Sequence, residues 1–160
     1  MAKLVPTLWF SEKAEEAAAF YASLLPDSQA DSVGALPADS PSGPAGSVKV
    51  VVFTLMGRPF LAFNGGRFEA FNHAFSLMVE CDDQDEIDRL WAALSEGGQI
   101  ERCGWLKDRY GLSWQIVPSA LGAMMADADP VRAKRAAEAM LKMTKFDIAE
   151  LQRAYDGRAA

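Results

Sequence analysis

The feature that most constrains the fold is a pattern that occurs twice along the chain. In each copy a run of strand-forming residues leads into an amphipathic helix, and a hairpin pattern follows. The two helices align with each other, because residues 20–24 (FYASL) match residues 90–94 (LWAAL) 70 positions later. One helix and a few strands bury little apolar surface alone, so the two copies are expected to share one fold.

The first copy is predicted from runs rich in strand-forming residues and from apolar residues that recur at three- and four-residue spacing in the helix. Ser11 precedes the helix and offers a side-chain oxygen to its open amide groups. The segment 34–47 is rich in Gly, Pro, Ser and Ala, which predicts a mobile loop that is either a plain connector or a lid over a ligand site. Strands are predicted at residues 4–10, 48–56 and 59–63, with a helix at 12–25 and a turn at 57–58.

The second copy carries stronger signals. Asp83 and Glu86 form a capping-box pattern, and Gly97 follows the helix that they begin. A strand is predicted at 75–81, and residues 103–118 read as a strand, a polar turn and a second strand. The charges at the turn are interpreted as a solvated hairpin tip, with an anion site as the alternative; they are Lys107, Asp108 and Arg109.

These patterns predict an α+β fold with two βαβββ modules that form one curved mixed sheet. The helices would cover the convex side, and the other side would hold a ligand cleft. The modules are expected at about 1–66 and 72–120 of one domain, and residues 121–160 as a C-terminal helical extension. Asp147 and Glu150 predict the cap of its last helix. The methionines of the extension are interpreted as packing or subunit-contact residues; they are Met124, Met125, Met140 and Met143.

Composition and charge argue against several classes of protein. The formal net charge of −6 and the lack of a basic patch disfavour nucleic acid. No signal-peptide pattern and no run of 18 apolar residues occurs, which predicts a cytoplasmic protein without a membrane partner. Cys81 and Cys103 lack the spacing of a disulfide framework or a zinc ribbon. Cys103 is interpreted as a buried small side chain and not as a nucleophile.

Several short motifs, taken together with the duplication, resemble the PhnB-like branch of the vicinal oxygen chelate superfamily, which includes glyoxalase I, extradiol dioxygenases and bleomycin-resistance proteins. This resemblance spans nearly the whole chain. It implies paired modules, a cleft open to a ligand and a homodimer. The motifs lie at residues 63–66, 76–81, 103–108, 110–118 and 140–143.

The resemblance also implies a test for a metal site, because catalytic members hold a divalent ion with His or Glu ligands on the outer strands of each module. None of the residues at the corresponding positions is a good ligand. His73, the single histidine, falls beside an expected position and is a weak candidate. We therefore expect no cofactor, with a divalent metal as the alternative. The corresponding positions are Leu4, a residue near Leu61, Ala74 and Gln115.

Strand alternation names the residues that would line the cleft. If Gln115 faces it, Trp114 and Ile116 face the helices. A few hydrogen-bonding groups among apolar ones are typical of a small-molecule pocket, although leftover polar groups on a surface are the alternative. The cleft candidates are Ser76, Met78, Glu80, Ser113 and Gln115.

The sequence therefore favours a small-molecule binder of the PhnB-like type without a complete catalytic metal site. Two alternatives stay open: a metal-dependent lyase or dioxygenase, and an interaction protein that acts through its dimer surface. Some relatives carry the name of a demethylubiquinone methyltransferase, but no glycine-rich loop follows a strand to open a nucleotide-binding helix. Whether the chain is an enzyme is left open.

Overall fold

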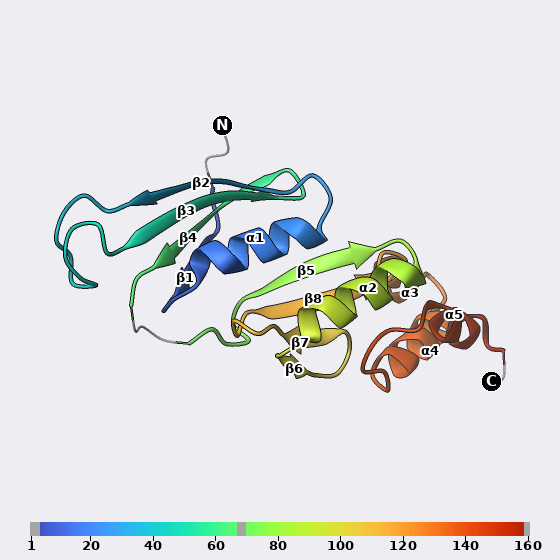
Figure 1. Ribbon diagram of the computed structural model, residues 1–160. Coiled ribbons are helices and arrows are strands. Elements are labelled where there is room, and N and C mark those ends of the chain that lie inside the picture. Colours follow the sequence, from blue (N-terminus) through green and yellow to red (C-terminus); the bar gives the residue numbers. More distant parts are fainter. Residues whose placement is uncertain (1–3, 67–69, 159–160) are drawn as a thin grey trace. The chain divides into compact units, whose positions relative to one another are not determined.

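The computed structural model describes residues 4–66 and 70–158, and the chain divides into two compact units, Met1–Ala70 and Phe71–Ala160. Each unit contains a four-stranded mixed sheet and a helix that follows its first strand (Figure 1). No helix among the described residues has the length and apolar character needed to cross a membrane.

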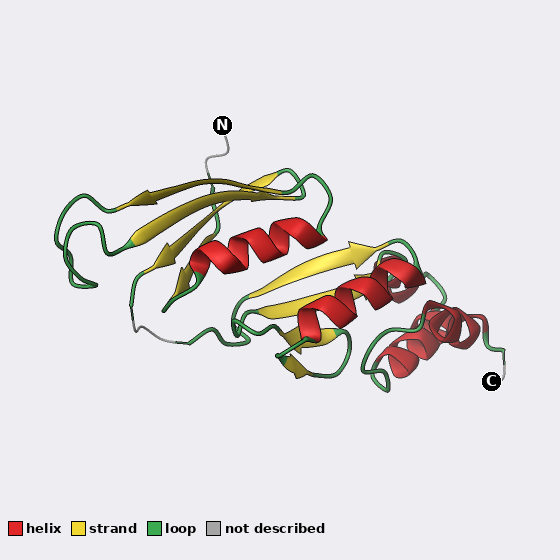
Figure 2. Ribbon diagram, in the orientation of Figure 1, coloured by secondary structure: helices red, strands yellow, loops and turns green. Residues whose placement is uncertain are grey.

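The first unit places one helix on one face of its sheet (Figure 2). The sheet has the order β1-β4-β3-β2, in which β1 and β4 are parallel and the other pairs antiparallel. The helix buries a stripe of small residues and Tyr21, and the facing strand residues include Phe10 and Phe53. The elements are β1 (Thr7–Phe10), α1 (Ala14–Leu24), β2 (Gln29–Ala35), β3 (Lys49–Leu55) and β4 (Arg58–Asn64).

The start of α1 differs from the prediction that Ser11 caps it. The N-cap residue is Lys13, which makes no side-chain capping bond. Instead, Asn64 at the end of β4 accepts a hydrogen bond from the Ala14 amide through Oδ1, at 2.6 Å. The cap is supplied by a residue 50 positions away in sequence, so no local pattern around the helix could reveal it.

Two further differences concern the strands of this unit. The hairpin turn between β3 and β4 lies at Met56 and Gly57, both with positive φ (47° and 72°), one residue earlier than predicted. Positive φ at both positions suits the right-handed twist of a two-residue hairpin. The predicted βαβββ pattern includes the edge strand β2, but its position was not predicted from the sequence, because all seven of its residues are exposed and show no alternation.

The second unit repeats the same arrangement. Its sheet has the order β5-β8-β7-β6, with β5 and β8 parallel, and α2 covers one face (Figure 2). The duplication is therefore visible in the topology. The elements are β5 (Ser76–Cys81), α2 (Gln84–Ser95), β6 (Gln99–Ile100), β7 (Trp105–Lys107), β8 (Ser113–Pro118), α3 (Leu121–Met125), α4 (Pro130–Met140) and α5 (Ile148–Asp156).

The local sequence pattern predicted helix α2 correctly. Asp83 accepts a hydrogen bond from the Glu86 amide at 2.8 Å, as the capping-box pattern predicts. The helix buries Ile87, Leu90, Trp91 and Leu94. On the facing strands the fully buried side chains include Trp114 and Ile116, as alternation predicts.

The C-terminal helices belong to the second unit and attach to it through backbone contacts. The amides of Cys103 and Gly104 donate to the carbonyls of Met143 and Thr144 at 2.9 and 2.8 Å. The Gln84 side chain donates to the Phe146 carbonyl. Met124 and Met143 are buried, which agrees with a packing role for these two methionines.

The α+β class, the two modules and the C-terminal helices are confirmed. Backbone hydrogen bonds order the strands as two four-stranded sheets, each open at its edges. The predicted domain limits at residues 66, 72 and 120 stay predictions.

Candidate functional site

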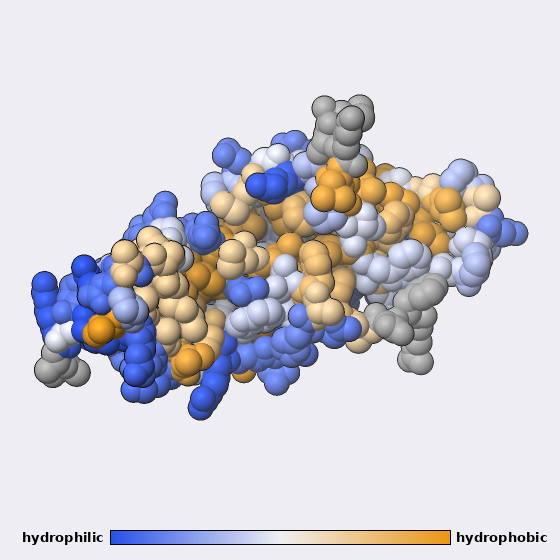
Figure 3. Space-filling model, turned by 180° about the vertical axis from the view of Figure 1, so that it is seen from behind, coloured by the Kyte–Doolittle hydropathy of each residue, from blue (hydrophilic) through white to orange (hydrophobic). Residues whose placement is uncertain are grey.

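The first unit has an apolar hollow on the face of its sheet turned away from α1. The hollow encloses about 240 Å³. Figure 3 shows hydrophobic residues gathered over this unit. The centre of the hollow is an aromatic pair, Trp9 of β1 and Phe63 of β4, whose ring centroids lie 5.5 Å apart. The lining is completed by Leu36, Ser40, Pro41, Ser42, Val48 and Val50.

Strand alternation and one glycine position Trp9. Leu8 and Phe10 are buried under α1, so Trp9 points to the opposite face, where its side chain is 40% exposed. A Cβ atom at Gly65 would lie 2.0 Å from the Trp9 ring. Gly65 therefore provides the space in which the indole packs, and any larger residue would displace it.

The loop at 36–48 forms one wall of the hollow. It begins two residues later than the predicted loop, because residues 34 and 35 belong to β2. Ser40 and Gly43 exchange two backbone hydrogen bonds of 2.9 and 3.0 Å. Asp39 accepts a further hydrogen bond from the Ala45 amide. These contacts fold the loop on itself, so Ser40, Pro41 and Ser42 reach the aromatic pair as one short turn.

The second unit presents a more polar face on the side of its sheet turned away from α2. We call it the polar face; strand register places its residues in two rows. In the first row Ser76, Ser113 and Lys107 lie side by side on β5, β8 and β7. In the second row Met78, Gln115 and Trp105 do the same.

The structure brings the predicted cleft candidates onto this face. Gln115 donates to the Ser76 hydroxyl through Nε2, at 2.8 Å. Met78 and Glu80 are exposed on β5. Ser113 is fully buried, and its hydroxyl is without a hydrogen-bond partner among the described residues. Their assignment to a ligand cleft stays a prediction.

His73 lies just before β5 and pairs with a carboxylate. Its Nε2 atom is 2.7 Å from Glu101 Oε2, and its ring centroid is 5.8 Å from that of Trp105. Neither Glu101 nor Trp105 was predicted as a site residue from the sequence, and Lys107 was predicted only as part of the charged hairpin tip. Alternation along 105–107 could have placed Trp105 and Lys107 on the face of Gln115, but the His73 contact joins segments 28 residues apart and leaves no local signal.

The residues present do not fit the divalent ion that the superfamily resemblance implies. Leu4 is 87% exposed and carries no donor atom. The Ala74 side chain and Leu61 likewise lack donors, and Gln115 is engaged with Ser76. In the part of the chain that the structure describes, no three His, Cys, Asp or Glu side chains gather as a metal would require. His73 and Glu101 together supply too few ligands for a catalytic ion.

Asp108 is the clearest difference from the sequence-based interpretation of the hairpin tip. It is 3% exposed, not solvated. Its Oδ1 atom accepts from the amides of Tyr110 and Leu112, and its Oδ2 atom accepts from the Trp114 indole at 2.8 Å. Asp108 therefore organises the β7–β8 turn from inside and does not offer a surface for an anion.

Comparison with known proteins agrees with this architecture. A solved PhnB protein from Bacillus cereus, described as a 3-demethylubiquinone-9 3-methyltransferase, is 32% identical over 73% of this chain and 99% of its own, with a TM-score of 0.64. A protein from Pseudomonas aeruginosa is 23% identical over 74% and 98%, with a TM-score of 0.55. No curated protein matches the sequence.

More distant structures share the fold. The fosfomycin resistance protein FosX from Mesorhizobium loti is 12% identical over 79% of this chain and 100% of its own, with a TM-score of 0.56. Glyoxalase I from Leishmania major is 11% identical over 81% and 94%, with a TM-score of 0.52. Residues 2–117 match the family described as 3-demethylubiquinone-9 3-methyltransferase. With its duplicated modules, the chain belongs to this PhnB-like family of the vicinal oxygen chelate superfamily.

Proposed function

We propose that the chain binds a small, largely apolar molecule in the hollow of its first unit, and that it does so without a metal ion. The observation that supports this most strongly is the aromatic pair beside the 36–48 loop, in which Trp9 is exposed and Phe63 half-buried. Pockets for drug-sized ligands measure roughly 300–1,000 Å³, and this hollow is smaller, at about 240 Å³. We therefore expect a compact ligand.

The side chains available to bind a metal argue against the metal-dependent alternative. A lyase or dioxygenase of this superfamily would need three or four ligands around one ion. The described residues offer His73 and Glu101, which are already paired with each other.

Methyl transfer, which the family description names, has little support in the residues. Each sheet passes from its first strand to its helix through a short polar turn, Ser11 to Lys13 in the first unit and Asp82 to Asp83 in the second. Neither turn contains the glycines that let a backbone approach a nucleotide. We also propose, from the family resemblance, a cytoplasmic homodimer.

The test is a titration of metal-stripped protein with a neutral apolar probe. Protein dialysed against EDTA is titrated with toluene while the indole N–H resonance of Trp9 is followed by NMR. We expect a saturable shift of this resonance. A shift that does not saturate, or no shift in a folded protein, would overturn the proposal.

Two variants localise the binding. Phe63→Ala removes half of the aromatic pair and should weaken toluene binding about tenfold, since burial of an aromatic ring in a ligand contact is worth more than 1 kcal/mol. Gly65→Ala should displace Trp9 and abolish its shift, because the added Cβ has no space. Gly122→Ala is the matched control, since a Cβ there meets no atom within 4 Å.

A further inference from the structure

Three hydrogen-bond donors stand side by side on the polar face of the second sheet. Ser76, Ser113 and Lys107 are register partners on β5, β8 and β7. Neighbouring strands lie about 4.8 Å apart, and partner residues point to the same face. The row therefore offers two hydroxyl groups and an ammonium group within the span of one small ligand.

Ser113 lies in the centre of the row, and its hydroxyl group has no hydrogen-bond partner among the described residues. Its side chain is fully buried, and its Oγ atom is the one buried side-chain oxygen or nitrogen without a partner in the described ranges 4–66 and 70–158. A buried hydroxyl without a partner is unfavourable for folding. A ligand oxygen would supply the missing acceptor.

The charges along the polar face favour a negatively charged ligand beside the row of Ser76, Ser113 and Lys107. Lys107 has no carboxylate partner within the described part of the chain. Glu101, at the neighbouring edge, is already paired with His73. Glu80 is the remaining carboxylate of the face, and it lies four residues along β5 from Ser76, about 13 Å away.

We propose that the polar face binds the oxyanion group of a small organic acid, with Lys107 and the Ser113 hydroxyl as the donors. Trp105, in the next row beside Gln115, provides an apolar surface for the rest of the ligand. Lys107 has a flexible four-carbon chain, so it can move to admit the anion beside Ser113. This inference goes beyond the proposed function, because it concerns a second site, on the sheet of the second unit, and a different class of ligand.

The experiment is an NMR titration of the full-length protein, in which the indole N–H resonance of Trp105 is assigned with Trp105→Phe. Benzoate, its neutral analogue benzamide and inorganic phosphate are the probes. We expect a saturable shift with benzoate and at least tenfold weaker binding of benzamide. A shift with phosphate at lower concentration than benzoate would assign the anion to the phosphate class. Equal binding of benzamide and benzoate would overturn the proposal.

Two variants test the donors separately. Lys107→Gln should weaken benzoate binding about tenfold or more, because a charge-assisted hydrogen bond is lost. Ser113→Ala should weaken benzoate binding as well, yet raise the melting temperature of the free protein, since it removes a buried group without a partner. A purely structural serine would not give this opposite pair of effects. Lys142→Gln, at an exposed lysine after α4, is the control and should leave benzoate binding unchanged.

The two proposals fail in distinguishable ways. If toluene shifts Trp9 but benzoate leaves Trp105 unchanged, the apolar hollow stands and the oxyanion site is overturned. If neither probe binds the folded protein, both are overturned. If benzoate shifts Trp105 and the shift is lost in Lys107→Gln, the oxyanion site stands whatever toluene does.

Discussion

At the residue scale, Asp108 shows how one buried carboxylate can fix a turn. It accepts hydrogen bonds from two backbone amides and from the buried Trp114 indole. Because it is 3% exposed, water cannot replace these contacts when they are lost.

We therefore predict that Asp108→Asn destabilises the protein by about 2–4 kcal/mol, since the amide turns one acceptor into a donor that faces donors. Urea unfolding followed by circular dichroism measures this change. Asp85→Asn, at an exposed carboxylate in the first turn of α2, is the control and should cost less than about 1 kcal/mol. Equal effects of the two variants would show that Asp108 is not a buried acceptor.

Cys81 gives a prediction about pH. Burial, assisted by the negative charge of Glu86, raises the pKa of its thiol from 9.0 to about 12. The folded state therefore holds the proton more tightly than the unfolded state. The resulting stability is complete below pH 9 and is lost as the pH rises from 9 toward 12, by up to about 1.4 kcal/mol per pH unit.

Unfolding measured between pH 8 and 11 checks this slope, and Cys81→Ala should flatten it. The same pKa predicts that Cys81 in the native protein is alkylated by iodoacetamide at pH 8 about a thousandfold more slowly than in urea. Rapid labelling of Cys81 without denaturant would contradict this account.

At the element scale, local sequence patterns predicted a helix correctly where its apolar residues are periodic and the residue just before it caps it. The stripe of α2 and its Asp83 cap predicted that helix, and the Asp147 cap of α5 was predicted in the same way. The cap of α1 comes from Asn64 on another strand, and β2 is exposed along its whole length. These elements depend on tertiary partners, which a local reading of sequence does not contain.

The same distinction between local patterns and tertiary contacts applies to the candidate site. Alternation correctly placed Ser76 and Gln115 on one face, where they hydrogen-bond. The sequence did not reveal the hollow around Trp9, because it depends on Phe63, on the folded 36–48 loop and on the space above Gly65. The burial of Asp108 in a run of three charges was likewise missed, since its partner Trp114 lies beyond the turn.

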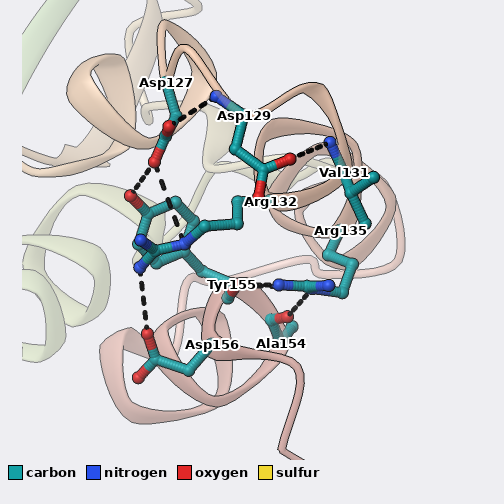
Figure 4. A network of polar contacts seen from close by, with 8 residues as sticks. All are labelled: Asp127, Asp129, Val131, Arg132, Arg135, Ala154, Tyr155 and Asp156. Atoms are coloured by element: carbon teal, nitrogen blue, oxygen red, sulfur yellow. Dashed lines mark hydrogen bonds and ion pairs between the residues drawn. The ribbon is translucent and has the colours of Figure 1, made fainter.

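The C-terminal helices are joined by a polar network around Tyr155 (Figure 4). Its hydroxyl donates to Asp127, and the Arg132 guanidinium lies 4.1 Å from its ring centroid while also contacting Asp127 and Asp156. Arg135 donates to the Tyr155 carbonyl at 2.8 Å. The network ties the turn before α4 to the end of α5.

We predict a favourable coupling between Asp127 and Tyr155 in a double-mutant cycle of Asp127→Asn and Tyr155→Phe. The Tyr155 hydrogen bond holds the pKa of Asp127 below its ordinary value of 3.8. The coupling should therefore be complete above pH 3.8 and decrease as the pH falls through the lower pKa of the folded state.

Amide hydrogen exchange in α4 and α5 measures this coupling. The exposed pair Lys134 and Glu138 provides a control cycle that should show little coupling. A coupling for Asp127 and Tyr155 that is no larger than this control would show that the network does not hold the helices together.

At the scale of the whole molecule, the chain keeps the duplicated topology of its superfamily but not a set of metal ligands within its described residues. Its first sheet offers an apolar hollow, and its second sheet offers a row of donors. We therefore propose that the side chains themselves bind the ligand.

The measurement that tests this claim most directly is a comparison of toluene binding by EDTA-dialysed protein and by the same protein supplied with Zn²⁺ or Mn²⁺, with metal content determined by elemental analysis. The account predicts equal dissociation constants and no stoichiometric metal in the stripped sample. Binding that requires one divalent ion per chain, and that His73→Ala abolishes, would contradict it.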